Sequence, residues 1–134
     1  MEKRKKKGFT LIEMVVVLAI IAVLAGIAVP QALNSINKSK STADIANAKA
    51  LAGAITQGVA EGQITLADTQ NAWKIVNTTN ISNLNKYISS IPKSKKYDVE
   101  FEYKYDAANG ILTIGVKDNQ DNYHILYPNP EANY

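Results

Sequence analysis

Hydrophobic residues in the first third of the chain form one long, nearly unbroken run. Met14–Val29 contains no charged or strongly polar side chain, and with Phe9–Ile12 it approaches the roughly 20 residues that a helix needs to cross a bilayer. After Pro30, Leu33 and Ile36 continue the apolar stripe at helical spacing. The pattern predicts a helix that begins as a membrane-length segment and continues beyond it.

A second helical stripe follows without a linker. Its apolar side chains recur at three- and four-residue steps, at Ile45, Ala48, Ala52, Ile55 and Val59. Polar side chains are expected on the remaining, solvent-facing surface, at Lys38, Lys40, Asp44, Asn47 and Lys49. Gly62 after Glu61 is a typical helix stop, so the predicted helix runs from Phe9 to about Glu61. Its length is roughly 80 Å at ~1.5 Å per residue.

The last third of the chain shows the period-of-two pattern of β-strands. Apolar Val99, Phe101, Tyr103 and Tyr105 alternate with charged Glu100, Glu102 and Lys104. The Asp106–Gly110 turn, which ends in Asn-Gly, leads into a second strand, Ile111–Val116. A polar turn at Lys117–Asn122 precedes a third strand, Tyr123–Tyr127. These patterns predict an α+β fold, in which the Ile45–Val59 stripe of the long N-terminal α-helix packs on a small three-stranded antiparallel sheet.

The segment between helix and sheet carries weaker signals. Gln63–Thr79 is polar and irregular, and Trp73, Ile75 and Val76 are expected to anchor it on the helix. Asn80 or Ser82 is suited to cap a short helix. In that helix Leu84, Tyr87, Ile88 and Ile91 share a face, and Pro92 ends it.

Charge and composition narrow the functional classes. The net charge of +3 comes from the first eight residues, because ten basic and eleven acidic residues remain without Met1–Gly8. The body of the protein therefore has no evident nucleic-acid site. The absence of cysteine excludes disulfides, thiolate catalysis and Cys-type zinc sites. His124 is the only histidine, and we expect it on the surface of its strand without an acidic partner.

Other candidate chemistry is weak, and we expect neither enzymatic activity nor a cofactor. Asp118, Asn119, Asp121 and Asn122 place four oxygen ligands close together, but they lack the pattern of a calcium loop and its distal Glu. A β-turn is the better interpretation, with Asp118 and Asp121 as weak metal candidates. Glu100 and Glu102 have a spacing that suits paired-acid catalysis, but Lys104 on the same face favours a solvated surface.

One carboxylate, Glu13, stands at the start of the apolar run. A charge in hydrocarbon is costly and usually marks a functional position with a partner. A cleaved secretory signal does not explain it, because the run is too long and no small-residue cleavage site follows Gly26-Ile27-Ala28. A plain membrane anchor with its basic cluster in the cytoplasm explains the orientation but not the acid.

The residues around this carboxylate resemble the class III signal of type IV prepilins. Gly8-Phe9-Thr10-Leu11-Ile12-Glu13 follows a short Lys-rich leader and precedes the apolar run. The resemblance implies that the prepilin peptidase cuts after Gly8, that Phe9 becomes the N-methylated mature N-terminus, and that Glu13 is the assembly glutamate. It also implies the type IV pilin fold and three parts. Residues 1–8 are the leader peptide, 9–33 the transmembrane and assembly half of the helix, and 34–134 the globular pilin domain.

The partner of Glu13 is expected to be an amine. No Lys or Arg follows it before Lys38, so the candidate is the amino group that cleavage creates at Phe9, on this chain or on a neighbour. Gly26 and Pro30 are expected to break or bend the helix at the end of its apolar half. The resemblance further implies that this stretch partly melts in the filament.

The resulting functional prediction is a structural subunit of a type IV pilus. Its implied partners are copies of itself, the prepilin peptidase and methyltransferase, the pilus assembly platform, and the lipid membrane before assembly. The subunit is then a single-pass membrane protein with a cytoplasmic N-terminus, and afterwards part of an extracellular fimbrium for adhesion or twitching motility. Alternatives are a type II secretion pseudopilin, a competence pilus subunit and, more distantly, a membrane-anchored binding module that never polymerises.

The lack of cysteine also bears on the source and on the end of the chain. Pilins commonly close their C-terminal region with a disulfide, and this chain has none. Its absence, with the Lys-, Asn- and Ile-rich composition, suggests a Gram-positive anaerobe. It also leaves the order of Pro128–Tyr134 open.

Overall fold

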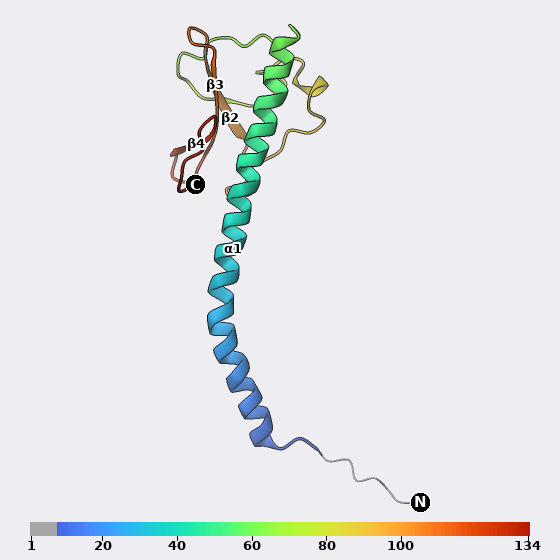
Figure 1. Cartoon of the computed structure of the whole chain (residues 1–134), viewed down its shortest axis with the longest axis vertical. Coiled ribbons are helices and arrows are strands. Elements are labelled where there is room, and N and C mark those ends of the chain that lie inside the picture. The colour runs from blue at the N-terminus through green and yellow to red at the C-terminus, as the bar shows by residue number, and fades with distance from the viewer. Residues whose placement is uncertain (1–7) are drawn as a thin grey trace, which may run out of the picture. The chain divides into compact units, whose positions relative to one another are not determined.

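The structure, a computed structural model, describes residues 8–134 and contains one long helix and one antiparallel sheet (Figure 1). The elements are helix α1 (Leu11–Ala60), strand β1 (Lys74–Ile75), the 3₁₀-helix η1 (Leu84–Lys86), and strands β2 (Phe101–Asp106), β3 (Ile111–Lys117) and β4 (Tyr123–Tyr127). Apart from Gly8, the predicted leader peptide lies outside the described residues. The α+β fold class is confirmed.

Helix α1 confirms the predicted long helix to within two residues at each end. It is unbroken over 50 residues and contains Pro30 in its interior. The chain divides into two compact units, one ending at Ile36 and one beginning at Asn37, and each is described by itself. The predicted bend and melting at Gly26 and Pro30, and the domain boundaries at residues 8 and 33, remain predictions.

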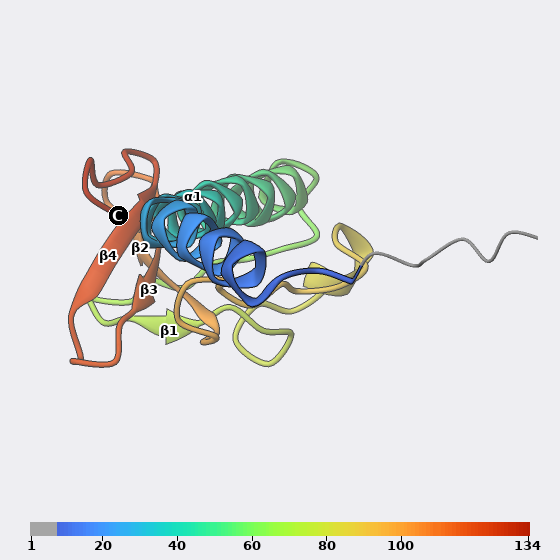
Figure 2. The same cartoon turned by 90° about the horizontal axis from the view of Figure 1, so that it is seen from below.

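The sheet has four strands in the order β1-β2-β3-β4, all antiparallel (Figure 2). The three predicted strands are present, and β2 pairs with β3 in register from Phe101↔Val116 to Asp106↔Ile111. The prediction missed β1, which adds Lys74 and Ile75 to the free edge of β2. A two-residue strand shows no periodicity, so the sequence pattern carried no signal for it.

The core of the second unit lies between α1 and the sheet. Ala48, Leu51, Ala52 and Ile55 are at most 1 % exposed, and they share one hydrophobic cluster with Phe101, Tyr103, Ile114, Val116 and Leu126. Of the predicted stripe, Ile45 is partly buried, whereas Val59 is exposed and does not belong to the core.

Trp73 does not anchor on the helix as predicted. Its ring stacks on Tyr123 with centroids 4.7 Å apart, and it lies against Gly115, where an added Cβ would meet it at 3.0 Å. Gly115 alternates along β3 with the buried Ile114 and Val116, so Trp73 covers the face of the sheet that points away from the core. Val76 is buried as predicted.

The predicted short capped helix is also corrected. Only Leu84–Lys86 is helical, as a single 3₁₀ turn, and Asn83 precedes it without a side-chain cap. Asn80 is used elsewhere, because its Nδ2 donates a 2.8 Å hydrogen bond to the carbonyl of Ile75 in β1. The expected apolar face still forms, since Leu84 is buried while Tyr87, Ile88 and Ile91 pack against the core.

Candidate assembly site

The first half of α1 exposes an apolar surface that water does not favour. Every large apolar side chain from Phe9 to Ile36 is between 46 and 83 % exposed. Soluble monomers rarely show contiguous apolar patches above a few hundred Å². Among the described residues, α1 is the one helix long and apolar enough to cross a membrane, and its most apolar window has no buried residue.

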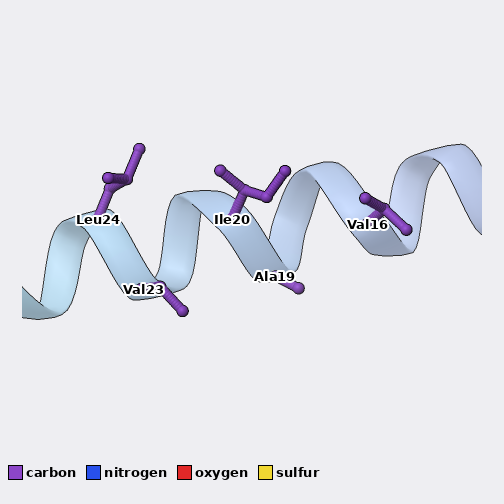
Figure 3. Close-up of a pocket in the computed structure, with 5 residues that line it drawn as sticks. All are labelled: Val16, Ala19, Ile20, Val23 and Leu24. Atoms are coloured by element: carbon purple, nitrogen blue, oxygen red, sulfur yellow. The ribbon is translucent and has the colours of Figure 1, made fainter.

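This surface has relief that suits helix packing. Val16, Ala19, Ile20, Val23 and Leu24 line a shallow apolar depression of about 350 Å³ (Figure 3). In that view Ile20 and Leu24 project to one side of the helix, and Ala19 and Val23 to the other. Rows of side chains four residues apart form ridges, and a ridge of one helix fits the groove between two ridges of another. Lipid tails and a neighbouring helix are both compatible with such a surface.

Glu13 and Thr10 form a capping box at the start of α1. The backbone N–H and the hydroxyl of Thr10 donate to Glu13 Oε2 at 2.7 and 3.0 Å, and Glu13 N–H donates back to Thr10 Oγ1 at 3.3 Å. Thr10 immediately precedes the helix and Glu13 is its third residue, which is the arrangement of the Thr-x-x-Glu signature. Our sequence reasoning missed this role, although the spacing carries it.

The capping box lowers the free-energy cost of placing the Glu13 carboxylate in an apolar segment. The predicted partner of Glu13 was an amine, but within one subunit the carboxylate already accepts two hydrogen bonds. A second shallow depression, lined by Phe9, Ile12, Glu13, Val16 and Val17, places this single acid in apolar surroundings. The carboxylate is therefore satisfied locally, and Phe9 lies beside it.

The other predicted site residues lie apart from Glu13. Gly8 and Phe9 precede the helix and are exposed, and an added Cβ on Gly8 would have no neighbour within 4 Å. Gly26 is equally open, and Pro30 lies within the helix. The roles of these residues in cleavage, methylation and helix bending remain predictions.

Asp44, predicted on the solvent-facing surface, is fully buried. Its Oδ2 accepts hydrogen bonds from the Ser94 and Tyr134 hydroxyls at 2.6 Å each, and the backbone N–H groups of Lys95 and Lys96 also donate to the carboxylate. A buried carboxylate is tolerated only when donors replace its lost water. Tyr134 thereby joins the end of the 128–134 segment to α1. Burial, followed by the bond to Asp44, raises the pKa of the Tyr134 hydroxyl.

His124 was expected without an acidic partner, but it has two. Its Nδ1 lies 2.9 Å from Glu131 Oε2 and its Nε2 lies 3.2 Å from Asp118 Oδ2. The bonds to Glu131 and Asp118 raise the pKa of His124 against the opposing effect of burial. The partners were missed because they lie six and seven residues away, outside any local pattern.

The polar turn after β3 is confirmed. Asp118 accepts bonds from the N–H groups of Gln120 and Asn122 at 2.8 Å each, and these contacts lower its pKa to about 2. The contact from Asn122 is the larger cause. Asp121 pairs with Lys117 at 2.9 Å. In residues 8–134 no group of three or more His, Asp or Glu side chains is arranged so that it could hold a metal ion, and the weak candidates Asp118 and Asp121 are engaged with other partners.

Comparison with known proteins agrees with this geometry. Residues 3–29 match the family described as the prokaryotic N-terminal methylation motif. The chain is 32 % identical over 119 residues to the type IV major alpha-pilin of Moraxella bovis, covering 87 % of this chain and 73 % of that protein. It is 33 % identical over 119 residues to a fimbrial protein of Pseudomonas aeruginosa, covering 88 % and 64 % respectively. The chain belongs to the type IV pilin family.

Further findings limit what the relatives imply. The chain spans 64 %, less than two thirds, of the length of the Pseudomonas fimbrial proteins that it matches. It is also 40 % identical over 55 residues to the type II secretion system core protein G of Pseudomonas aeruginosa, which covers 41 % of this chain and 39 % of that protein. No solved structure matches the chain significantly. The expected source in a Gram-positive anaerobe is not supported, because these relatives come from Pseudomonas and Moraxella.

Proposed function

We propose that this protein is a structural subunit of a type IV pilus, without enzymatic activity. It is held in the membrane by the first half of α1 and then polymerises with copies of itself through the same surface into an extracellular filament. The observation that carries the proposal is the combination of an apolar half-helix whose large side chains are all exposed with one carboxylate at its first turn.

Processing of the precursor is part of the proposal. The prepilin peptidase removes residues 1–8, and the new amino group of Phe9 is methylated. Support comes from the exposure of Gly8 and Phe9, which leaves the bond between them open to an enzyme, and from the match of residues 3–29 to the methylation motif. The pilus assembly platform then extracts the cleaved subunit from the membrane.

Assembly uses Glu13 as the residue that sets the register between subunits. An acid in an apolar helix bundle is stable only opposite a counter-charge or donors, so a misaligned helix would leave it unpaired. The neighbour's Phe9 amino group is the proposed counter-charge. Because the capping box already holds the carboxylate, assembly exchanges donors from Thr10 for an amine rather than creating the first partner of Glu13.

A type II secretion pseudopilin is the alternative that a specific observation favours, because 55 residues of this chain are also 40 % identical to the core protein G. A competence pilus subunit uses the same N-terminal chemistry. A non-polymerising membrane-anchored binding module is the most distant alternative, and it gives Glu13 no role beyond the capping box with Thr10.

The test is mass spectrometry of filaments sheared from cells that express this chain. We expect the filament subunit to begin at methylated Phe9. A matched Gly8→Val variant should accumulate uncleaved in the membrane, because a small residue lets the peptidase reach the bond. Filaments that contain a different N-terminus, or cleavage at Phe9 in the variant, would contradict the proposal.

A further inference from the structure

The segment 128–134 packs along one edge of the sheet in the second unit without a covalent cross-link. β4 is an edge strand of the sheet, so one row of its backbone groups has no strand partner. Glu131 covers part of that edge, because its N–H donates to the carbonyl of Ile125 and its Oε1 accepts from the Ile125 N–H, both at 3.0 Å. Figure 2 shows the end of the chain beside β4.

His124 joins this segment to the rest of the domain. Its imidazole lies between Glu131 of the segment and Asp118 of the turn after β3. The Tyr97 and Tyr134 rings lie near it, with centroids 5.8 and 5.6 Å away. The remaining charged groups around this cluster are Lys96, whose ammonium lies over the Tyr134 and Tyr97 rings, and Asp44, which accepts from the Tyr134 hydroxyl.

We propose that segment 128–134 acts as a latch, a segment that docks on and covers the β4 edge, and that protonation of His124 controls it. The latch is closed while the His124 imidazolium holds Glu131. A protonated imidazole donates from both nitrogens and satisfies both carboxylates at once. A neutral imidazole has one N–H, so the other nitrogen turns a lone pair toward a carboxylate oxygen. One of the two contacts must then weaken.

The weakened contact is the one to Glu131. Asp118 is held in place by the Gln120 and Asn122 N–H groups, and its side chain is 13 % exposed. Glu131 is 42 % exposed and belongs to a segment with no strand pairing of its own. The proton of the neutral ring therefore stays on Nε2 toward Asp118, and the Nδ1 side releases Glu131.

The sign of the pH dependence follows from the partners of His124. Both carboxylates favour its charged form, so its pKa is raised in the closed state. The closing contribution is fully present below the ordinary pKa of about 6.5 and is lost as the pH rises through the raised value. Among the contacting groups, Asp118 has a pKa of about 2, the Ile125 N–H lowers that of Glu131, and burial raises those of Tyr97 and Tyr134. Between pH 6 and 9, His124 is thus the contacting group that changes charge.

Amide hydrogen exchange in the full chain, held in detergent micelles, tests the latch directly. The Ile125 N–H reports on it because its acceptor is Glu131 Oε1. We expect its protection factor, corrected for the intrinsic rate at each pH, to fall by about tenfold or more from pH 6 to 9, the loss of a hydrogen bond to a charged group. The midpoint should match the pKa of His124 read from its single imidazole NMR signal. The Thr69 N–H, which donates to the Tyr105 carbonyl, is the internal control and should not change.

Two variants decide the outcome. His124→Gln should fix the Ile125 protection at the alkaline value across the range, and Glu131→Gln should abolish the transition even if the first variant folds poorly. Tyr134→Phe removes only the bond to Asp44 and should keep the transition with its midpoint unchanged. Equal wild-type protection at pH 6 and 9, or a transition that persists in either Gln variant, would overturn the proposal.

Discussion

At the scale of single residues, two carboxylates define this molecule, and both are satisfied by donors close at hand. Glu13 closes a capping box with Thr10 in the apolar half of α1. Asp44 lies in the second half of the same helix, fully buried beneath the 94–97 turn and Tyr134. The first is available for exchange with a neighbour because it is exposed, whereas the second is a fixed internal anchor.

The anchoring role of Asp44 is open to test. Asp44→Asn replaces one acceptor oxygen by an NH₂ group that faces donors, so it should lower the free energy of unfolding by about 2–4 kcal/mol, as expected for a disrupted buried polar network. Urea unfolding of the full chain in micelles, followed by the fluorescence of Trp73, the only tryptophan, measures it. The exposed Asp98→Asn control should change it by less than ~0.5 kcal/mol. Equal effects of the two changes would refute the anchor.

At the scale of elements, the long helix and strands β2, β3 and β4 were predictable because each carries many repeats of its own period. The alternation through Phe101 and Tyr103 fixed the inward face of β2, and the Asn-Gly turn placed its end. The errors fall where a contact joins residues distant in sequence. Asp44 looked like any polar helix residue until Ser94 and Tyr134, fifty and ninety residues later, were placed beside it. The capping box was local, and we overlooked it.

Trp73 and β4 offer the sharpest test of the sheet. An added Cβ on Gly115 would meet the His124 carbonyl oxygen at 2.6 Å and the Trp73 ring at 3.0 Å. Gly115→Ala should therefore destabilise the domain by about 1–3 kcal/mol through overpacking. Gly53→Ala is the matched control, because its helical site has no neighbour within 4 Å, and it should stabilise by roughly 1 kcal/mol. A neutral Gly115→Ala would show that β4 and Trp73 are wrongly placed.

At the scale of the whole molecule, the chain combines a folded unit from Asn37 onward with an apolar half-helix whose large side chains, from Phe9 to Ile36, are exposed. The buried hydrophobic cluster of the second unit begins at Ala48, with Ile45 packed against it, and Ser41 and Asp44 are the first buried residues of α1. We therefore expect the apolar half to be dispensable for folding of the second unit and to be required for membrane insertion and assembly.

Removal of Met1–Leu33 should leave a soluble, monomeric domain. We expect a single cooperative thermal transition and a monomer mass in sedimentation equilibrium, since the core and the Asp44 anchor stay intact. Aggregation or the loss of a cooperative transition would show that the sheet depends on the removed residues.

The central claim is that Glu13 sets the register between subunits and is not needed for leader cleavage. It is tested most directly by the filament yield of the Glu13→Gln and Glu13→Ala variants. Membrane insertion of the alanine variant should be unharmed, because a charge has been removed from the apolar segment. Yield of sheared filaments should nevertheless fall in the order wild type, Gln, Ala. The glutamine side chain keeps an oxygen that can accept a hydrogen bond from Thr10 or from a neighbouring subunit, whereas alanine has no acceptor. The amount of cleaved subunit in the membrane should stay roughly constant across the three. An alanine variant that polymerises as well as wild type, or one that is not cleaved, would contradict the account.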